Sequence, residues 1–190
     1  MKKRILSMLL IGMLFSQSAF AAESSRFSDV PSNASYAEAV NTLADMGILN
    51  GDKEGRFNPN QTITRAEATV IICKIMGVAD EASKIKQSTF SDVPSNYWAV
   101  GYIAKANELG IVSGYSKTKF GPKDPVTCQQ MLKMLVCAIG RADEAIENGG
   151  WPDGYIEVAK KYSYSENTEQ KYTENARRST VAVYISNLMY

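Results

Sequence analysis

One arginine in this sequence stands at a position where binding chemistry is expected. Arg65 lies in the run Thr64-Arg65-Ala66-Glu67, whose Thr-x-x-Glu spacing is typical of a capping box at a helix start. Arg65 then occupies the first helical position, beside the positive end of the helix dipole, where an anion is favoured and a cation is not. A cation at this position therefore needs a specific reason, such as an anionic partner.

The residue types that usually carry catalysis are missing or scattered. The chain has no histidine, which excludes histidine bases, histidine metal sites and serine–histidine triads. No nucleophile motif or pair of carboxylates stands out, so we expect no enzyme and no cofactor. Asp52–Asn58 has a faint likeness to a calcium loop, but it lacks the glycine that an EF-hand needs at the sixth place, so no metal site is predicted.

The three cysteines form no recognisable framework. Cys73, Cys128 and Cys137 are an odd set with irregular spacing, unlike a disulfide scaffold or a zinc site. We interpret them as small buried or half-buried side chains, with a Cys73–Cys137 bridge as the alternative. Cys128 also stands at a predicted helix start, where a thiol with a lowered pKa is a further hypothesis.

The first 21 residues are typical of a secretory signal peptide. A basic start at Lys2, Lys3 and Arg4 precedes a short apolar stretch and a small-residue cleavage site. We place cleavage after Ala21, with Ala22 as the near alternative. Removing those three cations leaves 18 basic residues against 20 acidic ones, a balance that argues against a nucleic-acid partner. No later segment approaches the length of a transmembrane helix. We therefore expect a secreted protein with no transmembrane segment after signal removal.

The sequence contains a duplicated unit. Residues 27–33, Phe-Ser-Asp-Val-Pro-Ser-Asn, recur unchanged 63 positions later as residues 90–96. The same offset, without a gap, pairs Gly47 with Gly110, Gly51 with Gly114, Phe57 with Phe120, Pro59 with Pro122 and Thr64 with Thr127. A register held over this distance indicates an internal repeat.

Each unit is expected to fold as helix, loop, helix. Apolar residues recur at helical spacing over residues 36–46, and Gly47 ends that helix. Residues 68–76 are apolar nearly all round, which predicts a second helix buried on most sides. In the second copy the equivalent helices are residues 98–109 and 131–139.

A third, degenerate copy follows. Gly154-Tyr155-Ile156 resembles Gly101-Tyr102-Ile103, and residues 181–189 repeat the apolar second helix. Arg178 falls in the arginine column at an offset of 113, with Arg177 as the alternative alignment. The fold class we expect is all-α, with three helix-loop-helix repeats in a pseudo-threefold bundle and the second helices at its centre. The predicted boundaries are 1–21 for the signal peptide and 22–85, 86–147 and 148–190 for the three repeats.

These motifs together resemble the S-layer homology domain, a module usually found in three copies on exported bacterial proteins. The matching residues are Phe27-x-Asp29-Val30, Gly47-Ile48-Leu49-x-Gly51, Phe57-x-Pro59 and Ile63-Thr64-Arg65-Ala66-Glu67, with Phe90-x-Asp92-Val93, Trp98-Ala99, Gly110-Ile111-Val112-x-Gly114 and Phe120-x-Pro122 in the second copy. The resemblance implies a module that binds secondary cell wall polysaccharide with acidic, pyruvylated sugars. It also implies a location at the cell wall or S-layer of a bacterium.

The resemblance places ligand-binding residues in grooves between the repeats: Arg65, Arg178, Trp98, Asp29, Asp92, Gly51 and Gly114. A guanidinium can hold a pyruvate carboxylate in a bidentate pair beside the N–H groups of a helix start. The tryptophan would stack on a sugar, the glycines would admit backbone close to it, and the aspartates would orient hydroxyls or the arginines. Core packing of the tryptophan and backbone turning by the aspartates are the alternatives.

The second copy departs from the pattern at one informative place. Thr127 and Gln130 keep the capping box, but Cys128 replaces the arginine between them. The fold therefore does not need an arginine there. We predict that the groove built on Arg65 is the best preserved, that Arg178 contributes less, and that a groove relying on the second copy is weak or closed.

Two functions compete at this point. The first is non-covalent anchoring to the envelope through polysaccharide binding. The alternative is a structural envelope protein whose degenerate repeats mediate self-assembly or contacts with other envelope proteins. Because the chain ends at Tyr190, we expect no cargo domain after the repeats unless the sequence is a truncated form of a longer protein.

Overall fold

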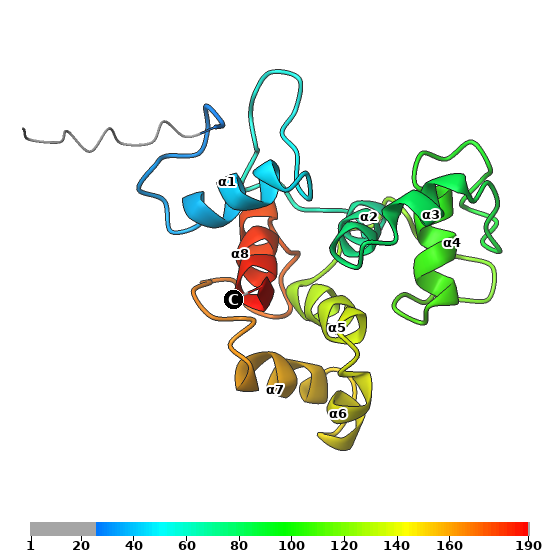
Figure 1. Cartoon of the computed structure of the whole chain (residues 1–190). Helices are drawn as coiled ribbons and strands as arrows, with labels where there is room; N and C mark the ends of the chain where they lie inside the picture. The colour runs from blue at the N-terminus through cyan, green and yellow to red at the C-terminus, as the bar shows by residue number, and fades with distance from the viewer. Residues whose placement is uncertain (1–25, 190) are drawn as a thin grey trace, which may run out of the picture.

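The computed structural model describes residues 26–189, which form eight α-helices and no sheet (Figure 1). The helices are α1 (Ala37–Asp45), α2 (Arg65–Ile75), α3 (Ala79–Lys84), α4 (Val100–Glu108), α5 (Cys128–Ala138), α6 (Ala142–Glu147), α7 (Asp153–Lys161) and α8 (Arg178–Met189). The all-α prediction is confirmed. Within these residues no helix combines the length and apolar character needed to cross a membrane. The predicted signal peptide lies outside the described residues.

The predicted starts of α2 and α5 are present. At the start of α2, Thr64 Oγ1 accepts from the Glu67 N–H while the Glu67 carboxylate accepts from the Thr64 N–H at 2.7 Å. Thr127 and Gln130 form the same reciprocal pair at the start of α5. Both predicted capping boxes are therefore confirmed.

The helices of one predicted unit pack mainly on helices of another unit. α4 packs on α2, α7 packs on α5, and α1 packs on α8, so the first described helix lies against the last (Figure 1). The short helices α3 and α6 join the first two of these groups. Among the described helices, α5 contacts both α2 and α8, but α2 and α8 do not pack on each other. The three second helices are thus linked through α5, and their place at the centre of a pseudo-threefold bundle stays a prediction.

A closed ring of backbone hydrogen bonds lies just before the three second helices. The Ile63 N–H donates to the Ala176 carbonyl, the Ala176 N–H to the Val126 carbonyl, and the Val126 N–H back to the Ile63 carbonyl, at 2.8–3.1 Å. All three residues are buried. The offsets of 63 and 113 place these residues in one column of the repeat alignment. The ring ties the three segments together at equivalent points, while the threefold relation of whole units and the repeat boundaries stay predictions.

Two glycines allow helices to meet at backbone distance. A Cβ atom added to Gly101 in α4 would lie 1.9 Å from the Ala82 carbonyl oxygen of α3. A Cβ atom on Gly154 in α7 would lie 1.9 Å from the Ala145 carbonyl oxygen of α6. Real structures do not tolerate such contacts, so the short helices hold their positions because these two sites lack side chains.

We expect Gly101→Ala to destabilise the protein by about 1–3 kcal/mol, because relieving the clash with Ala82 requires backbone movement. An ordinary Gly→Ala change inside a helix has the opposite sign and stabilises by roughly 0.5–1 kcal/mol. Urea unfolding of the wild type and of Gly101→Ala measures the difference in the free energy of unfolding. An unchanged or increased free energy of unfolding would contradict this packing.

Candidate carbohydrate-binding grooves

The first N–H groups of the three second helices are already bonded to backbone. In α2 the Arg65 and Ala66 N–H groups donate to the carbonyls of Asp124 and Pro122, at 2.8 and 3.1 Å. The starts of α5 and α8 are bonded in the same way to the carbonyls of residues 172 and 174 and of residues 59 and 61, at 2.8–3.0 Å. These N–H groups are therefore occupied within the protein, and the binding of a carboxylate by the arginine beside them stays a prediction.

Arg65 is fastened to the loop of the second unit. Its Nε donates to the Phe120 carbonyl at 2.9 Å, and its Nη2 donates to the Ser113 carbonyl at 2.7 Å. The guanidinium also lies 4.5 Å from the Phe120 ring centre and 4.6 Å from the Tyr115 ring centre. Burial lowers the pKa of the guanidinium, an effect that nearby acidic groups oppose, but arginine stays protonated in proteins. The side chain is a charged, rigidly held donor.

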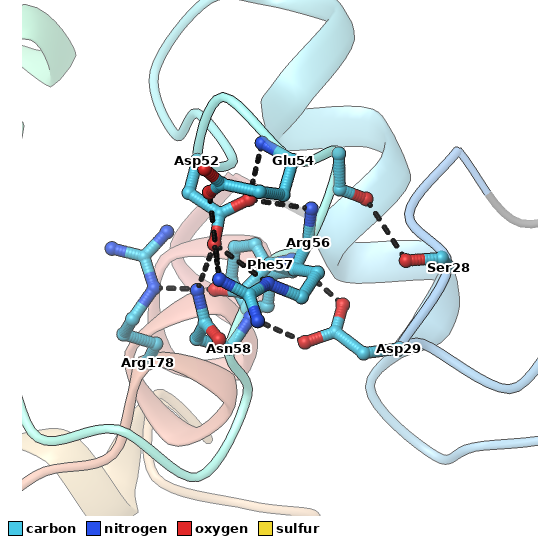
Figure 2. Close-up of polar contacts among 9 residues, drawn as sticks. Ser28, Asp29, Asp52, Glu54, Arg56, Phe57, Asn58 and Arg178 are labelled. Carbon is cyan, nitrogen blue, oxygen red and sulfur yellow. Dashed lines mark hydrogen bonds and ion pairs between the residues drawn. The ribbon is translucent and has the colours of Figure 1, made fainter.

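Arg178 makes the matching set of contacts with the first unit. Its Nε donates to the Phe57 carbonyl at 2.7 Å (Figure 2). Its Nη2 donates to the Asn50 carbonyl at 2.6 Å, and its guanidinium lies 4.6 Å from the Phe57 ring centre. Phe57 and Asn50 are 63 positions before the two acceptors of Arg65. Arg178, and not Arg177, is therefore the counterpart of Arg65. Burial lowers the pKa of this guanidinium as well.

The two predicted aspartates hold the loops that accept from the arginines. The Asp29 carboxylate accepts from the N–H groups of Phe57 and Asn58, both at 2.7 Å (Figure 2). The Asp92 carboxylate accepts from the N–H groups of Phe120 and Gly121, at 2.8 and 2.7 Å. Burial alone would raise the pKa of Asp92, but these N–H groups outweigh it and lower the pKa. Each aspartate thus fixes the peptide whose carbonyl its arginine binds.

The two predicted glycines serve the same loops. A Cβ atom at Gly51 would lie 2.5 Å from the Phe27 ring, and one at Gly114 would lie 2.4 Å from the Phe90 ring. These rings pack in turn on Phe57 and Phe120, with ring centres 5.5 and 5.3 Å apart. In the structure the missing side chains make room for aromatic packing inside the protein.

Asp52 organises the turn that presents Phe57 to Arg178. Its Oδ1 accepts from the N–H groups of Glu54 and Arg56, and its Oδ2 accepts from Arg56 Nε and Asn58 Nδ2, at 2.9–3.0 Å (Figure 2). These donors, the Arg56 backbone N–H foremost, lower the pKa of Asp52 to about 2. The loop that resembled a calcium site is thus closed on itself by one carboxylate.

Arg178 and Trp98 meet in one groove, which we call the Arg178 groove. Trp98 is 58% exposed, so packing in the core does not explain it. The groove has a volume of about 290 Å³ and runs along α2. Its lining residues are Ile48, Leu49, Asn50, Glu67, Val70, Ile71, Lys74, Trp98 and Arg178.

A second groove, the Arg65 groove, has the same plan one unit further on. Its volume is about 450 Å³, and it is lined by Arg65, Gly110, Ile111, Val112, Ser113, Gln130, Lys133, Met134, Cys137, Ala142, Ile146, Trp151 and Tyr155. Trp151, which is 45% exposed, takes the place of Trp98. Trp151 is not among the predicted site residues, although the offset of 53 that aligns Gly101 with Gly154 also aligns the two tryptophans.

The seven predicted residues are therefore not one site. Arg178 and Trp98 share a groove wall, and Arg65 lines the other groove. Asp29, Asp92, Gly51 and Gly114 lie outside both linings and support the loops behind them. The prediction about the second copy also needs refinement, because α5 of that copy forms a wall of the larger groove.

A third interface lies where the start of α5 contacts the loop around residues 172–174. Cys128 occupies the arginine position there, so this interface has a different chemistry from the two grooves. Its thiol is fully buried beside Tyr184, and burial raises its pKa, so the hypothesis of a reactive thiolate is wrong. All three cysteines are free, so the structure has no Cys73–Cys137 bridge.

Tyr184 is fully buried at the third interface. In the repeat alignment it falls in the column of Ile71 and Met134, which line the two grooves. A pocket of about 170 Å³ lies alongside α8, lined by polar residues that include Asn167 and Thr180.

Comparison with known proteins gives a family match for the first two units. Residues 26–69 and 89–132 each match the family model of the S-layer homology domain. These two segments are therefore similar to S-layer homology domains. The third copy predicted over residues 148–190 lies outside the matched segments and stays a proposal.

Similar proteins come from bacterial surfaces. The chain is 31% identical to a cell surface protein of Thermoanaerobacter kivui, over 100% of this chain and 24% of that protein. It is 34% identical to the surface-layer 125 kDa protein of Lysinibacillus sphaericus, over 73% of this chain and 12% of that protein, and 32% identical to a cellulosome-anchoring protein of Acetivibrio thermocellus, over 72% and 34%. The chain thus spans about a third or less of these relatives. The matches indicate a secreted protein of the cell wall or surface layer.

We expect stability to depend on Asp52 in strong acid. Its folded-state pKa of about 2 lies below the ordinary value of 3.8, so its contribution is full above about pH 4 and is lost as the pH falls toward 2. The free energies of unfolding of wild type and Asp52→Asn should therefore differ at pH 7 and converge near pH 2. Urea unfolding across this range measures the gap. A gap that is the same at both ends would contradict the role of the carboxylate.

Proposed function

We propose that this protein attaches non-covalently to the bacterial cell wall by binding acidic sugars of a secondary wall polysaccharide. The observation that carries the proposal is the pairing, in each of two grooves, of a rigidly held arginine with an exposed tryptophan. The relatives include proteins named for anchoring and for surface layers, which supports the same function. The role is non-enzymatic binding.

The arginines retain the donors that a carboxylate needs. An arginine has five N–H groups, and the backbone carbonyls take one from Nε and one from Nη2. Within residues 26–189, Nη1 of Arg65 and of Arg178 has no hydrogen-bond acceptor. The Nη1–Nη2 edge of each guanidinium is therefore free for a bidentate pair with the carboxylate of a pyruvate ketal. The carbonyl contacts fix the guanidinium in advance, which lowers the entropy cost of binding.

The tryptophans supply the contact to the sugar itself. A pyranose ring has an apolar face that packs on an aromatic ring, and an indole that is half exposed in the free protein offers such a surface. Asp29, Asp92, Gly51 and Gly114 act as positioning residues, since they hold the loops whose carbonyls orient Arg178 and Arg65. At the third interface Cys128 stands at the position of these two arginines, so we expect two grooves and not three to bind the acidic sugar.

A wall-binding assay tests this proposal. Mature protein should co-sediment with purified cell walls and lose that binding when the secondary polymer is extracted. Arg65→Ala should weaken binding by roughly 1.5–3 kcal/mol, as for a hydrogen bond to a charged group, and Trp151→Ala by about 1 kcal/mol. The sequence alone predicted a smaller contribution from Arg178. Because Arg178 and Trp98 make the matching arrangement, we now expect their alanine variants to lose similar amounts.

Met46→Ala is the matched control for removing an exposed apolar side chain. Met46 is 51% exposed and lines neither groove, so this variant should bind walls as wild type does. Binding that survives polymer extraction or the double variant Arg65→Ala/Arg178→Ala would contradict the proposal. Concentration-dependent self-association without polymer, measured by sedimentation, would favour the structural alternative instead.

A further inference from the structure

The two grooves share one plan but differ in charge at three matched positions. Glu67, Val70 and Lys74 of α2 line the Arg178 groove. Sixty-three positions later, Gln130, Lys133 and Cys137 of α5 line the Arg65 groove. Compared with the Arg178 groove, the Arg65 groove has a neutral amide in place of the carboxylate. Its lysine lies one helical turn earlier in the helix.

The two charged side chains of α2 in the Arg178 groove already form hydrogen bonds with other groups of the protein. The Glu67 carboxylate accepts from the N–H and hydroxyl groups of Thr64, at 2.7 and 2.9 Å. Lys74 Nζ donates to the carbonyls of Gly47 and Ile48, at 2.7 and 3.3 Å. Arg178 is therefore the main cation that this groove offers to a ligand.

Lys133 in the Arg65 groove, unlike Lys74, contacts aromatic rings and donates to no backbone carbonyl of the described residues. Its Nζ lies 5.3 Å from the Trp151 ring centre and 5.4 Å from the Tyr155 ring centre. Within the described part of the chain it makes no ion pair and no hydrogen bond, so all of its N–H donors are available. The cation–π contacts hold the ammonium against the groove wall, and no carboxylate lines this groove. Arg65 and Lys133 are thus two cations in one groove whose lining includes no acidic residue.

We propose that the Arg65 groove binds a sugar unit with two acidic groups, whereas the Arg178 groove binds a unit with one. One carboxylate pairs with the free edge of Arg65, and the second acidic group, a phosphate or another carboxylate, pairs with Lys133. The larger volume of this groove, about 450 against 290 Å³, is consistent with the bulkier ligand. The inference rests on the proposed function and adds a specificity-determining residue, Lys133, to it.

The chain has two tryptophans, one in each groove, so each groove can be observed separately. Protein labelled with 5-fluorotryptophan should give two ¹⁹F NMR signals, which Trp98→Phe and Trp151→Phe assign. The probes are a methyl glycoside bearing a pyruvate ketal, and the same compound with an added phosphate monoester. At the Trp151 signal, the two-acid probe should bind about tenfold more tightly than the one-acid probe, as expected for an added charge-assisted contact. At the Trp98 signal the two probes should bind about equally.

Substitutions at the matched positions test whether Lys133 causes this preference. Lys133→Val, which copies Val70, should lower the affinity of the two-acid probe at Trp151 about tenfold, to that of the one-acid probe. Lys133→Arg should keep the preference. Val70→Lys should create the preference at Trp98. Two dispersed ¹⁹F signals in each variant show that it is folded.

The outcomes separate the two proposals. If the one-acid probe binds in an arginine-dependent way but Lys133→Val leaves the tenfold preference intact, or if no preference exists, this inference is overturned and the proposed function stands. If neither probe moves either signal, both are overturned.

Discussion

The fold depends on the buried ring of three backbone hydrogen bonds that joins Ile63, Val126 and Ala176. A buried peptide group without a partner costs free energy, and each of these groups finds its partner on a distant segment of the chain. None of the three segments can therefore satisfy its peptides alone. The same constraint extends outward, because the first N–H groups of α2, α5 and α8 donate to loops of other units. A single helix-loop-helix unit is accordingly not an independent structure.

This interlocking explains why the arginines serve two purposes. Arg65 and Arg178 extend the helix-to-loop contacts by binding the Phe120 and Phe57 carbonyls, and those peptides are fixed from the other side by Asp92 and Asp29. A guanidinium held in this way keeps its outer edge free. The position is also dispensable for the fold, because Cys128 fills it with a buried thiol at the third interface. The arginine thus has both a structural and a proposed binding role, and the fold does not require it in every copy.

Much of this arrangement was accessible from the sequence, because repeats, capping boxes and glycine stops are local patterns. The start of α2 at Arg65 and that of α5 at Cys128 followed from their capping boxes. The partner of each helix did not follow, since periodicity shows which face is apolar but not what covers it, and α1 packs on α8 at the other end of the chain. The carbonyl acceptors of the arginines were invisible for the same reason. Trp151 precedes the Gly154-Tyr155-Ile156 match by three residues, and the offset of 53 from that match is the signal that places it in the column of Trp98.

The most direct test of the account is a crystal structure of the protein with a pyruvylated fragment of the wall polymer. We expect the ligand carboxylate within hydrogen-bond distance of the Nη1–Nη2 edge of Arg65 or Arg178 and the sugar against Trp151 or Trp98. The backbone ring at Ile63, Val126 and Ala176 should be unchanged. A carboxylate bound to the helix-start N–H groups, or a ligand outside both grooves, would contradict it.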